Sequence, residues 1–234
     1  MAYTTEIFTS SVVVVGNFNP TIFTPDWLEK NELIGRDDAE LIRQSPQIII
    51  SHQVTSFESD WFALQVLENQ FSLTSKGVLS PALRDLAAGI LQLVLHTPVS
   101  AVGLNFMAHL KIANQDGYYK IGDVLAPKTI WKDLFSAEND LPGLGNLGIR
   151  IQHGKRGEPV KNNDEIRLSV QPSDRVKQGI FVLYNDHHDV LSVEDDERTP
   201  TERAVSIVED KWESAWQDAI RVFDGLVTKA LAAS

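Results

Sequence analysis

The chain has 234 residues and no cysteine, which excludes disulfides, thiolate metal sites and a cysteine nucleophile. Hydrophobic residues make up 43% of it, enough for the chain to fold around a core of its own. Its formal net charge of −11, from 21 basic and 32 acidic residues, opposes the binding of nucleic acid or anionic lipid.

The densest basic stretch is His153-Gly154-Lys155-Arg156, with Lys161 nearby, and no aromatic residue interrupts it. Because a single-stranded nucleic acid stacks its bases on aromatic side chains, this stretch predicts a solvated hairpin tip and no nucleic-acid partner. No apolar run approaches the ~20 residues that span a bilayer, and no basic segment of a signal peptide is found at the start. We therefore expect a cytoplasmic protein without a membrane contact.

The start of the chain predicts one buried strand and two short helices. A strand is expected over 7–18, because the β-branched run Val12 to Val15 is typical of a strand buried on both faces. Thr24-Pro25 predicts the start of a helix, since Thr is a good N-cap and Pro suits the first helical position, and Gly35 is expected to end this helix. A second short helix is expected over 37–45.

A meander, a helix and a long strand are expected next. The three strands of the meander are predicted at 47–51, 61–67 and 70–75, the last two joined as a hairpin across Glu68-Asn69. From Ser80-Pro81 to Leu95 the apolar residues recur at spacings of three and four, so we expect a helix with one wide face on that sheet. From Val102 to Ile112 apolar and polar residues alternate, which predicts a half-buried strand.

The segment 114–146 is the least regular part of the sequence, with a short helix expected around 130–135, and we interpret it as a mobile or contact-making insertion. Three further strands are expected at 147–153, 165–171 and 179–184. The chain closes with a long amphipathic helix, whose start is marked by Thr199-Pro200-Thr201-Glu202, a capping box with proline at the first helical position.

The apolar stripe of this last helix extends from Val205 to Ala230, further than one small sheet usually covers. Trp212, Trp216 and Phe223 lie on the stripe. We therefore expect these three side chains to contact a partner protein or a second copy, giving a homodimer through the C-terminal helix. Packing in the core of the same chain is the alternative.

The order of these elements resembles a known family. A strand such as Val102-Gly103-Leu104-Asn105-Phe106 and a terminal helix closing on Phe223-Asp224-Gly225-Leu226-Val227-Thr228-Lys229-Ala230-Leu231 are similar to those of the sporadically distributed family of uncharacterised prokaryotic proteins. The last strand of that family ends in an Asp-x-Asp-like run, of which Leu183-Tyr184-Asn185-Asp186 keeps the final acid. The resemblance implies no reaction, and the patchy distribution implies mobile or defence-associated genes.

One stretch, Gly143-Leu144-Gly145-Asn146-Leu147-Gly148, matches the dinucleotide-binding pattern GxGxxG. That chemistry needs a strand before the glycines and a helix after them, so that the pyrophosphate lies on the helix N-terminus. Here Pro142 precedes the glycines and an alternating strand follows, which predicts a glycine-rich loop. Walker A, GxSxG and HExxH patterns are also missing, so we expect no cofactor.

The run Asp186-His187-His188-Asp189 offers the nitrogen and oxygen ligands that divalent cations take, and it is the candidate metal site. Adjacent residues at a strand end point to opposite faces, so both imidazoles reach one ion only with a bend and a third ligand. His109, His153 and Glu194 are candidates for that ligand. The alternative is a solvated strand end that leads into an acidic loop.

These observations predict an α+β fold with two consecutive groups of mainly antiparallel strands, a helix after the first group and a long C-terminal amphipathic helix. We expect a single domain over 1–234, with subdomains 1–98 and 99–234 as the alternative. Without a catalytic signature, the leading hypothesis is a non-catalytic binding or assembly protein that acts through protein contacts in a mobile-element or defence system. The alternative is a small-molecule-binding protein or metal-assisted hydrolase with its site near residues 186–189.

Overall fold

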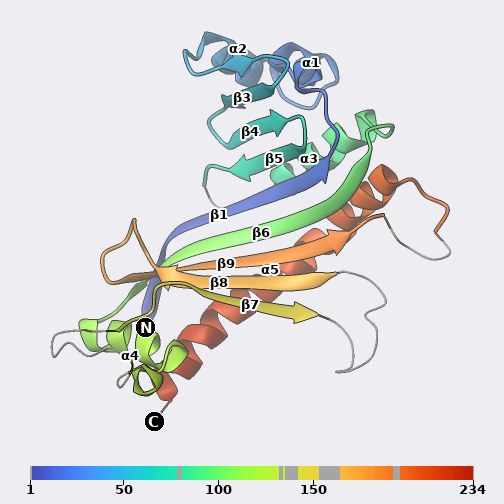
Figure 1. Cartoon of the computed structure of the whole chain (residues 1–234). Helices are drawn as coiled ribbons and strands as arrows, with labels where there is room; N and C mark the ends of the chain where they lie inside the picture. Colours follow the sequence, from blue (N-terminus) through green and yellow to red (C-terminus); the bar gives the residue numbers. More distant parts are fainter. Residues whose placement is uncertain are drawn as a thin grey trace.

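The computed structural model describes residues 2–77, 81–131, 134, 142–152, 164–191 and 196–233. Within these residues nine strands form one sheet in the order β2-β3-β4-β5-β1-β6-β9-β8-β7 (Figure 1). All its pairings are antiparallel, which confirms the predicted α+β class. The two predicted groups of strands meet in this one sheet, because β1 (Tyr3–Gly16) pairs with β6 (Val99–Ile112) along nearly its whole length.

The first strand lies in the middle of the sheet, as predicted, but it is buried on one face only, because no described helix covers the other. Val12 and Val14 are fully buried, whereas Val15 is 42% exposed, and β1 has β5 on one side and β6 on the other. The other strands of the first group are β2 (Ile49–Ile50), β3 (Val54–Glu58), β4 (Phe62–Leu67) and β5 (Gln70–Ser75). The predicted β4–β5 hairpin is confirmed, whereas β3 was missed because Thr55 and Ser56 interrupt its short apolar pattern.

The second group consists of β7 (Leu147–Gln152), β8 (Glu165–Pro172) and β9 (Gly179–Asp189). The last of these continues five residues beyond the predicted end at Tyr184. The extra residues are polar or charged, yet β6 pairs with the backbone of all five and β8 pairs with that of Asn185, Asp186 and His187. Backbone pairing with the neighbouring strands therefore extends the strand where its side-chain pattern predicts an end.

The helices are α1 (Pro25–Lys30), α2 (Arg36–Gln44), α3 (Pro81–Leu93), α4 (Gln115–Leu125) and α5 (Pro200–Ala232), with short 3-10 turns η1 (Pro20–Ile22) and η2 (Lys128–Ile130). The predicted caps are confirmed at Thr24 and in the capping box of Thr199 and Glu202. Helix α1 ends earlier than predicted, since Glu32 has a φ of 58°, which no α-helix continues. Within the described residues no helix is both long and apolar enough to cross a membrane.

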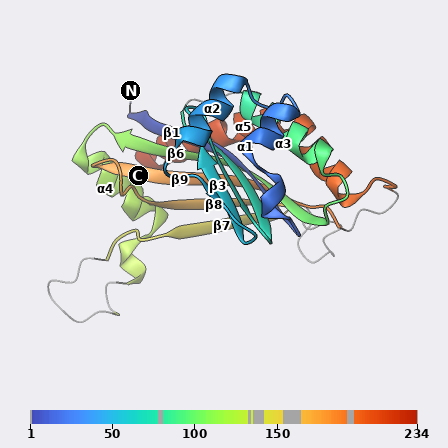
Figure 2. The same ribbon diagram turned by 90° about the horizontal axis from the view of Figure 1, so that it is seen from above.

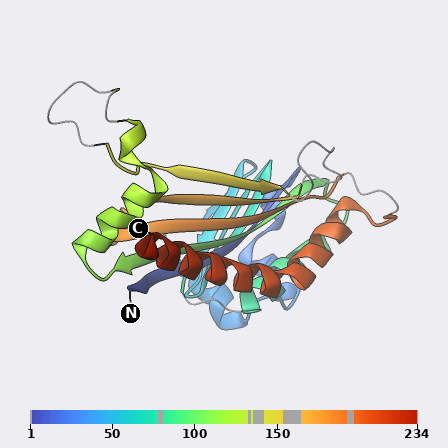
Figure 3. The same cartoon turned by 90° about the horizontal axis from the view of Figure 1, so that it is seen from below.

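Helices α1, α2, α3 and α5 cover one face of the sheet (Figures 2 and 3). The core lies between the two layers, where its largest fully buried side chains include Phe23, Phe57, Phe62, Phe71, Phe106 and Trp212. Helix α5 packs on β6, β9 and β1 and contacts α3 and α4. On the opposite face, which we call the open face, no described helix covers the strands, and Asn105 and Met107 of β6 are half-buried.

Candidate functional site

The run Asp186 to Asp189 forms the last four residues of β9. His187 pairs with Gly103 of β6 and with Glu165, the first residue of β8. The run is therefore a strand end, as the alternative predicts, but the end is not solvated throughout, because His188 is buried. As the pleat of a strand requires, neighbouring side chains point to opposite faces, so Asp186 and His188 face the helix layer and His187 and Asp189 face the open side.

His188 lies between two carboxylates on the helix side and is 8% exposed. Its Nδ1 is 3.1 Å from Asp164 Oδ2, and its Nε2 is 3.1 Å from Asp186 Oδ1. The second contact has ion-pair distance without the alignment of a hydrogen bond, so Asp164 is the better-placed partner. Burial alone would lower the pKa of His188, but the two carboxylates outweigh it and raise the pKa to about 9. The imidazole is therefore protonated at neutral pH.

This arrangement bears on the candidate metal site. Both ring nitrogens of His188 already face a carboxylate oxygen, and His187 points away to the other face. In the described part of the chain, no group of three or more His, Asp or Glu side chains is arranged to hold a metal ion. Of the proposed third ligands, His109 pairs with Phe181, which lies six residues before His187 in β9. His109 is therefore roughly 20 Å from His187. His153 and Glu194 lie outside the described residues.

On the open face a charged cluster surrounds Glu165, which is 4% exposed. Its carboxylate accepts a hydrogen bond from Arg167 Nε at 2.5 Å and lies 3.4 Å from Arg150 Nε. Burial opposes the charge of Glu165, but the two guanidinium groups outweigh it and lower its pKa. Burial and the nearby Arg167 lower the pKa of His187, so this imidazole is neutral at pH 7. Two cations therefore flank one buried carboxylate.

The polar row continues along the open face from His187 to Asn185. The Asn185 amide donates a hydrogen bond from Nδ2 to Asn105 Oδ1 at 2.8 Å. A Cβ at Gly103 would approach Asn185 Nδ2 to 2.7 Å. The amide of Asn185 therefore fits here because Gly103 has no side chain. The side chains of two neighbouring strands are thereby linked next to the charged cluster.

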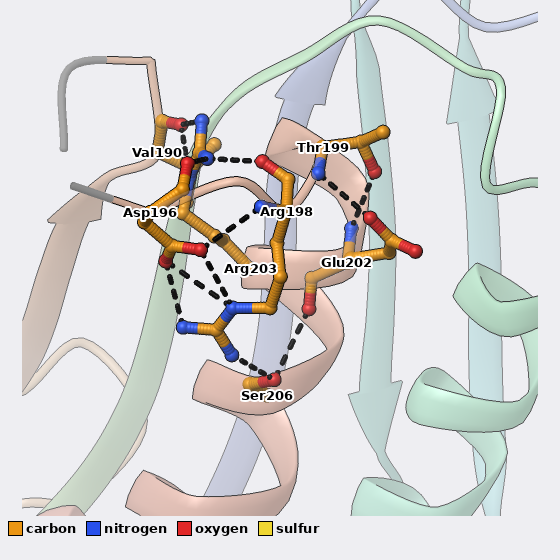
Figure 4. A network of polar contacts seen from close by, with 7 residues as sticks. All are labelled: Val190, Asp196, Arg198, Thr199, Glu202, Arg203 and Ser206. Atoms are coloured by element: carbon orange, nitrogen blue, oxygen red, sulfur yellow. Dashed lines mark hydrogen bonds and ion pairs between the residues drawn. The ribbon is translucent and has the colours of Figure 1, made fainter. Parts of the chain in front are cut away.

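A polar network holds the connection between β9 and the start of α5 (Figure 4). Arg203 is 8% exposed, and its Nε and Nη2 donate to the Val190 carbonyl at 2.9 and 2.6 Å, while Nη1 donates to the Arg198 carbonyl. Arg198 forms an ion pair with Asp196 and donates to Ser206 at 2.7 Å. Because the partners of Arg203 are carbonyls of the connecting segment, its role is to anchor the helix to the sheet.

The three predicted interface residues of α5 pack within their own chain. Trp212 and Phe223 are 1% and 3% exposed, and the Trp212 ring lies 5.1 Å from that of Phe106. Trp216 is half-buried, with its ring 4.6 Å from that of Phe8. The long apolar stripe is therefore accounted for by contacts with this sheet and with α3 and α4. Contact of α5 with a second copy stays a prediction, for which Ile220, 43% exposed, is the large apolar side chain available.

The outer edge of β7 has no neighbouring strand among the described residues. Ile149 and Ile151 pair with residues of β8 that face the helix layer, yet they are 41% and 45% exposed, because α5 packs further in on β6, β9 and β1. Figure 3 shows β7 at the edge of the sheet, away from α5. On the open side of the same strand, the Arg150 side chain is 67% exposed. We call Ile149, Arg150 and Ile151, together with Arg167 of β8, the β7 edge.

Sequence reasoning did not single out Arg150, Asp164, Glu165 or Arg167. Their contacts depend on the register of β7, β8 and β9, which no local pattern in these strands specifies. One available signal was the alternation of β8, which places Glu165 and Arg167 on the face opposite its apolar residues. No protein-family model matches the chain, and no curated protein is significantly similar to it.

Proposed function

We propose that this protein is a non-catalytic binding or assembly protein that receives an extended segment of a partner protein beside β7. The observation that carries the proposal is the β7 edge, where a strand with no described neighbour on its outer side carries exposed apolar and cationic side chains. Unpaired backbone N–H and C=O groups along such an edge pair readily with a further strand. The added strand would extend the sheet by backbone hydrogen bonds, and the side chains of the β7 edge would select it.

The opposite edge of the sheet is less suited to this role. Strand β2 has only two residues, Ile49 and Ile50, and very short edge strands are a common protection against pairing. The six residues of β7 extend over about 20 Å, which is enough to align a peptide segment. The greater length of β7 therefore makes it the better strand for pairing with a partner segment, although both edge strands expose isoleucine.

The side chains of the β7 edge specify the chemistry of the partner segment. Cross-strand neighbours lie about 5 Å apart, so a residue opposite Ile149 or Ile151 would contact the apolar surface on the helix side. Residues in the alternate positions would face Arg150 and Arg167. We infer a segment that alternates apolar and acidic residues, since carboxylates match exposed guanidinium groups.

Charge also favours a different protein over a second copy. Each chain carries a formal net charge of −11, so two copies repel each other at long range. An acidic segment of another molecule would instead pair at short range with Arg150 and Arg167 at the β7 edge, whose side chains are 67% and 45% exposed. In line with the family resemblance, the proposal places this partner in a mobile-element or defence system inside the cell. No observation on the described residues favours a metal-assisted hydrolase near residues 186–189.

The test begins with affinity purification of the tagged protein from its native host and identification of stoichiometric partners by mass spectrometry. Binding is then reconstituted with the purified partner, and the dissociation constant is compared for wild type and the double variant Ile149→Glu/Ile151→Glu. The matched control is Ile49→Glu/Ile50→Glu, which makes the same changes on the opposite edge at similar exposure. Both pairs of sites are exposed, so neither variant disturbs the core.

We expect the β7 variant to bind about 100-fold more weakly, because it loses apolar contacts and adds negative charge, while the control stays within about twofold. Equal affinities for wild type and the β7 variant would contradict the proposal. A wild-type dimer that the β7 variant disperses would instead identify a second copy as the occupant.

A further inference from the structure

A cavity of about 470 Å³ lies on another part of the molecule, between α4 and the ends of β8 and β9. Its lining includes Tyr118, Tyr119 and Gly122 of α4, Leu144 before β7, and Pro172 and Ile180 of β8 and β9. None of these residues belongs to the β7 edge. The cavity is therefore a separate feature, and its role is independent of the proposed function.

The cavity exists because α4 is held by contacts on its other sides. Asn114 caps the helix by accepting a hydrogen bond from the Gly117 N–H at 2.8 Å, and Ile121 is fully buried. The helix packs against α5 and β6, with a Cβ at Gly117 coming within 3.2 Å of Leu231. At Gly122, by contrast, a Cβ would meet only Leu144, at 3.8 Å. Glycine thus keeps open a space that a longer side chain would enter.

The lining determines which ligands suit the space. Most of it is apolar or aromatic, and Ile180 at its base is 2% exposed. The charged groups at the cavity, Asp123 and Lys128, form an ion pair at 2.8 Å and neutralise each other. The site therefore offers apolar surface without a net charge.

We propose that this cavity is a binding site for a neutral, mainly apolar small molecule. Its volume falls in the range of about 300 to 1,000 Å³ in which ligand pockets bury most of a drug-sized molecule. Asp123 and Lys128 pair with each other, so the lining carries no net charge that would favour an anionic or a cationic ligand.

Nile red, a neutral apolar dye whose fluorescence rises in apolar surroundings, is the probe. We expect saturable binding to the full chain and at least about tenfold weaker binding to Gly122→Leu, whose side chain enters the cavity. The matched control is Gly225→Leu in α5, also a helical glycine, where an added Cβ meets nothing within 4 Å. The control should bind the dye like wild type.

A second measurement uses the wild-type chain alone, so that it does not depend on the folding of a variant. Bound Nile red should slow amide hydrogen exchange in α4 and around Leu144 and leave β7 unchanged. No saturable dye binding, or binding that leaves α4 exchange unchanged, would overturn the proposal, and so would equal binding by Gly122→Leu and wild type. Tighter binding of an anionic dye such as anilinonaphthalene sulfonate would overturn the preference for a neutral ligand.

Discussion

The Nδ1 atom of His188 on β9 lies 3.1 Å from Oδ2 of Asp164, which immediately precedes β8. The other oxygen of that carboxylate accepts a hydrogen bond from the Asp189 backbone N–H at 3.1 Å. One carboxylate therefore joins the end of β9 to the beginning of β8 through both a side chain and the backbone. This contact stabilises the pairing of the strands that carry the charged cluster on the open face.

The raised pKa of His188 predicts a stability that depends on pH. The folded pKa of about 9 lies above the ordinary value of 6.5, so the contribution is complete below pH 6.5 and is lost as the pH rises to about 9. Over that window the free energy of unfolding should fall by roughly 2 to 3 kcal/mol. Urea unfolding of wild type and His188→Gln at a series of pH values tests this.

The variant should lack this pH-dependent loss, because glutamine has no proton to release. His187→Gln is the matched control: the pKa of His187 is lowered, so its removal should leave the loss above pH 6.5 in place. The account of His188 is contradicted if wild type and His188→Gln show the same pH dependence.

Replacing Gly103 by alanine should destabilise the protein although alanine is ordinarily preferred to glycine in strands. The new Cβ would approach Asn185 Nδ2 to 2.7 Å and displace the amide that bonds to Asn105. We expect a loss of about 1 to 2 kcal/mol in wild type. In an Asn185→Ala background the same change should be neutral or stabilising by about 0.5 kcal/mol. A double-mutant cycle by chemical unfolding measures the difference, and a coupling energy near zero would refute the steric explanation.

Loss of the Arg203 side chain should be costly because it leaves the buried carbonyl of Val190 and the part-buried carbonyl of Arg198 without this donor. We expect Arg203→Met to lower the free energy of unfolding by about 2 to 4 kcal/mol. Arg203→Lys should recover only part of this, since one ammonium cannot reproduce the planar fork. The exposed Arg198 is the control, and Arg198→Met should cost at most about 1 kcal/mol. Equal unfolding free energies for wild type and Arg203→Met would argue against an anchoring role.

The packing of α5 distinguishes the residues that it buries in the core from the exposed residue that is available for a dimer contact. Trp212→Ala should lower the free energy of unfolding by about 3 to 5 kcal/mol, because it empties a fully buried site against Phe106. Ile220→Glu on the exposed side of α5 should leave stability nearly unchanged. If α5 forms a homodimer, Ile220→Glu should halve the mass measured by sedimentation equilibrium, and an unchanged dimer would place the contact elsewhere.

The elements with strong local signals could be predicted from the sequence. The run Val12 to Val15 indicated a central strand, and Thr199 to Glu202 indicated the first turn of α5. Helix α4 was missed because Gly117 and Gly122 lower its helix propensity, and its cap at Asn114 follows directly on a strand. The extent of β9 was missed because its last residues are polar, and their backbone pairs with neighbouring strands only in the assembled sheet.

Only part of the candidate site could be predicted from local strand geometry. That His187 and His188 point to opposite faces follows from the pleat alone. That Asp164 meets His188 depends on the register between β8 and β9, which pairs residues more than twenty positions apart in the sequence. The exposure of Ile149 and Ile151 depends on where α5 lies on the sheet, and the apolar pattern of β7 by itself predicts burial.

Amide hydrogen exchange of the protein with and without its purified partner tests the central claim most directly. The account predicts that the partner slows exchange in β7, from Leu147 to Gln152, and leaves β2 unchanged, because strand addition gives new acceptors to the free N–H groups of that edge. Slowed exchange in β2 or α5, with β7 exchanging as in the free protein, would contradict it.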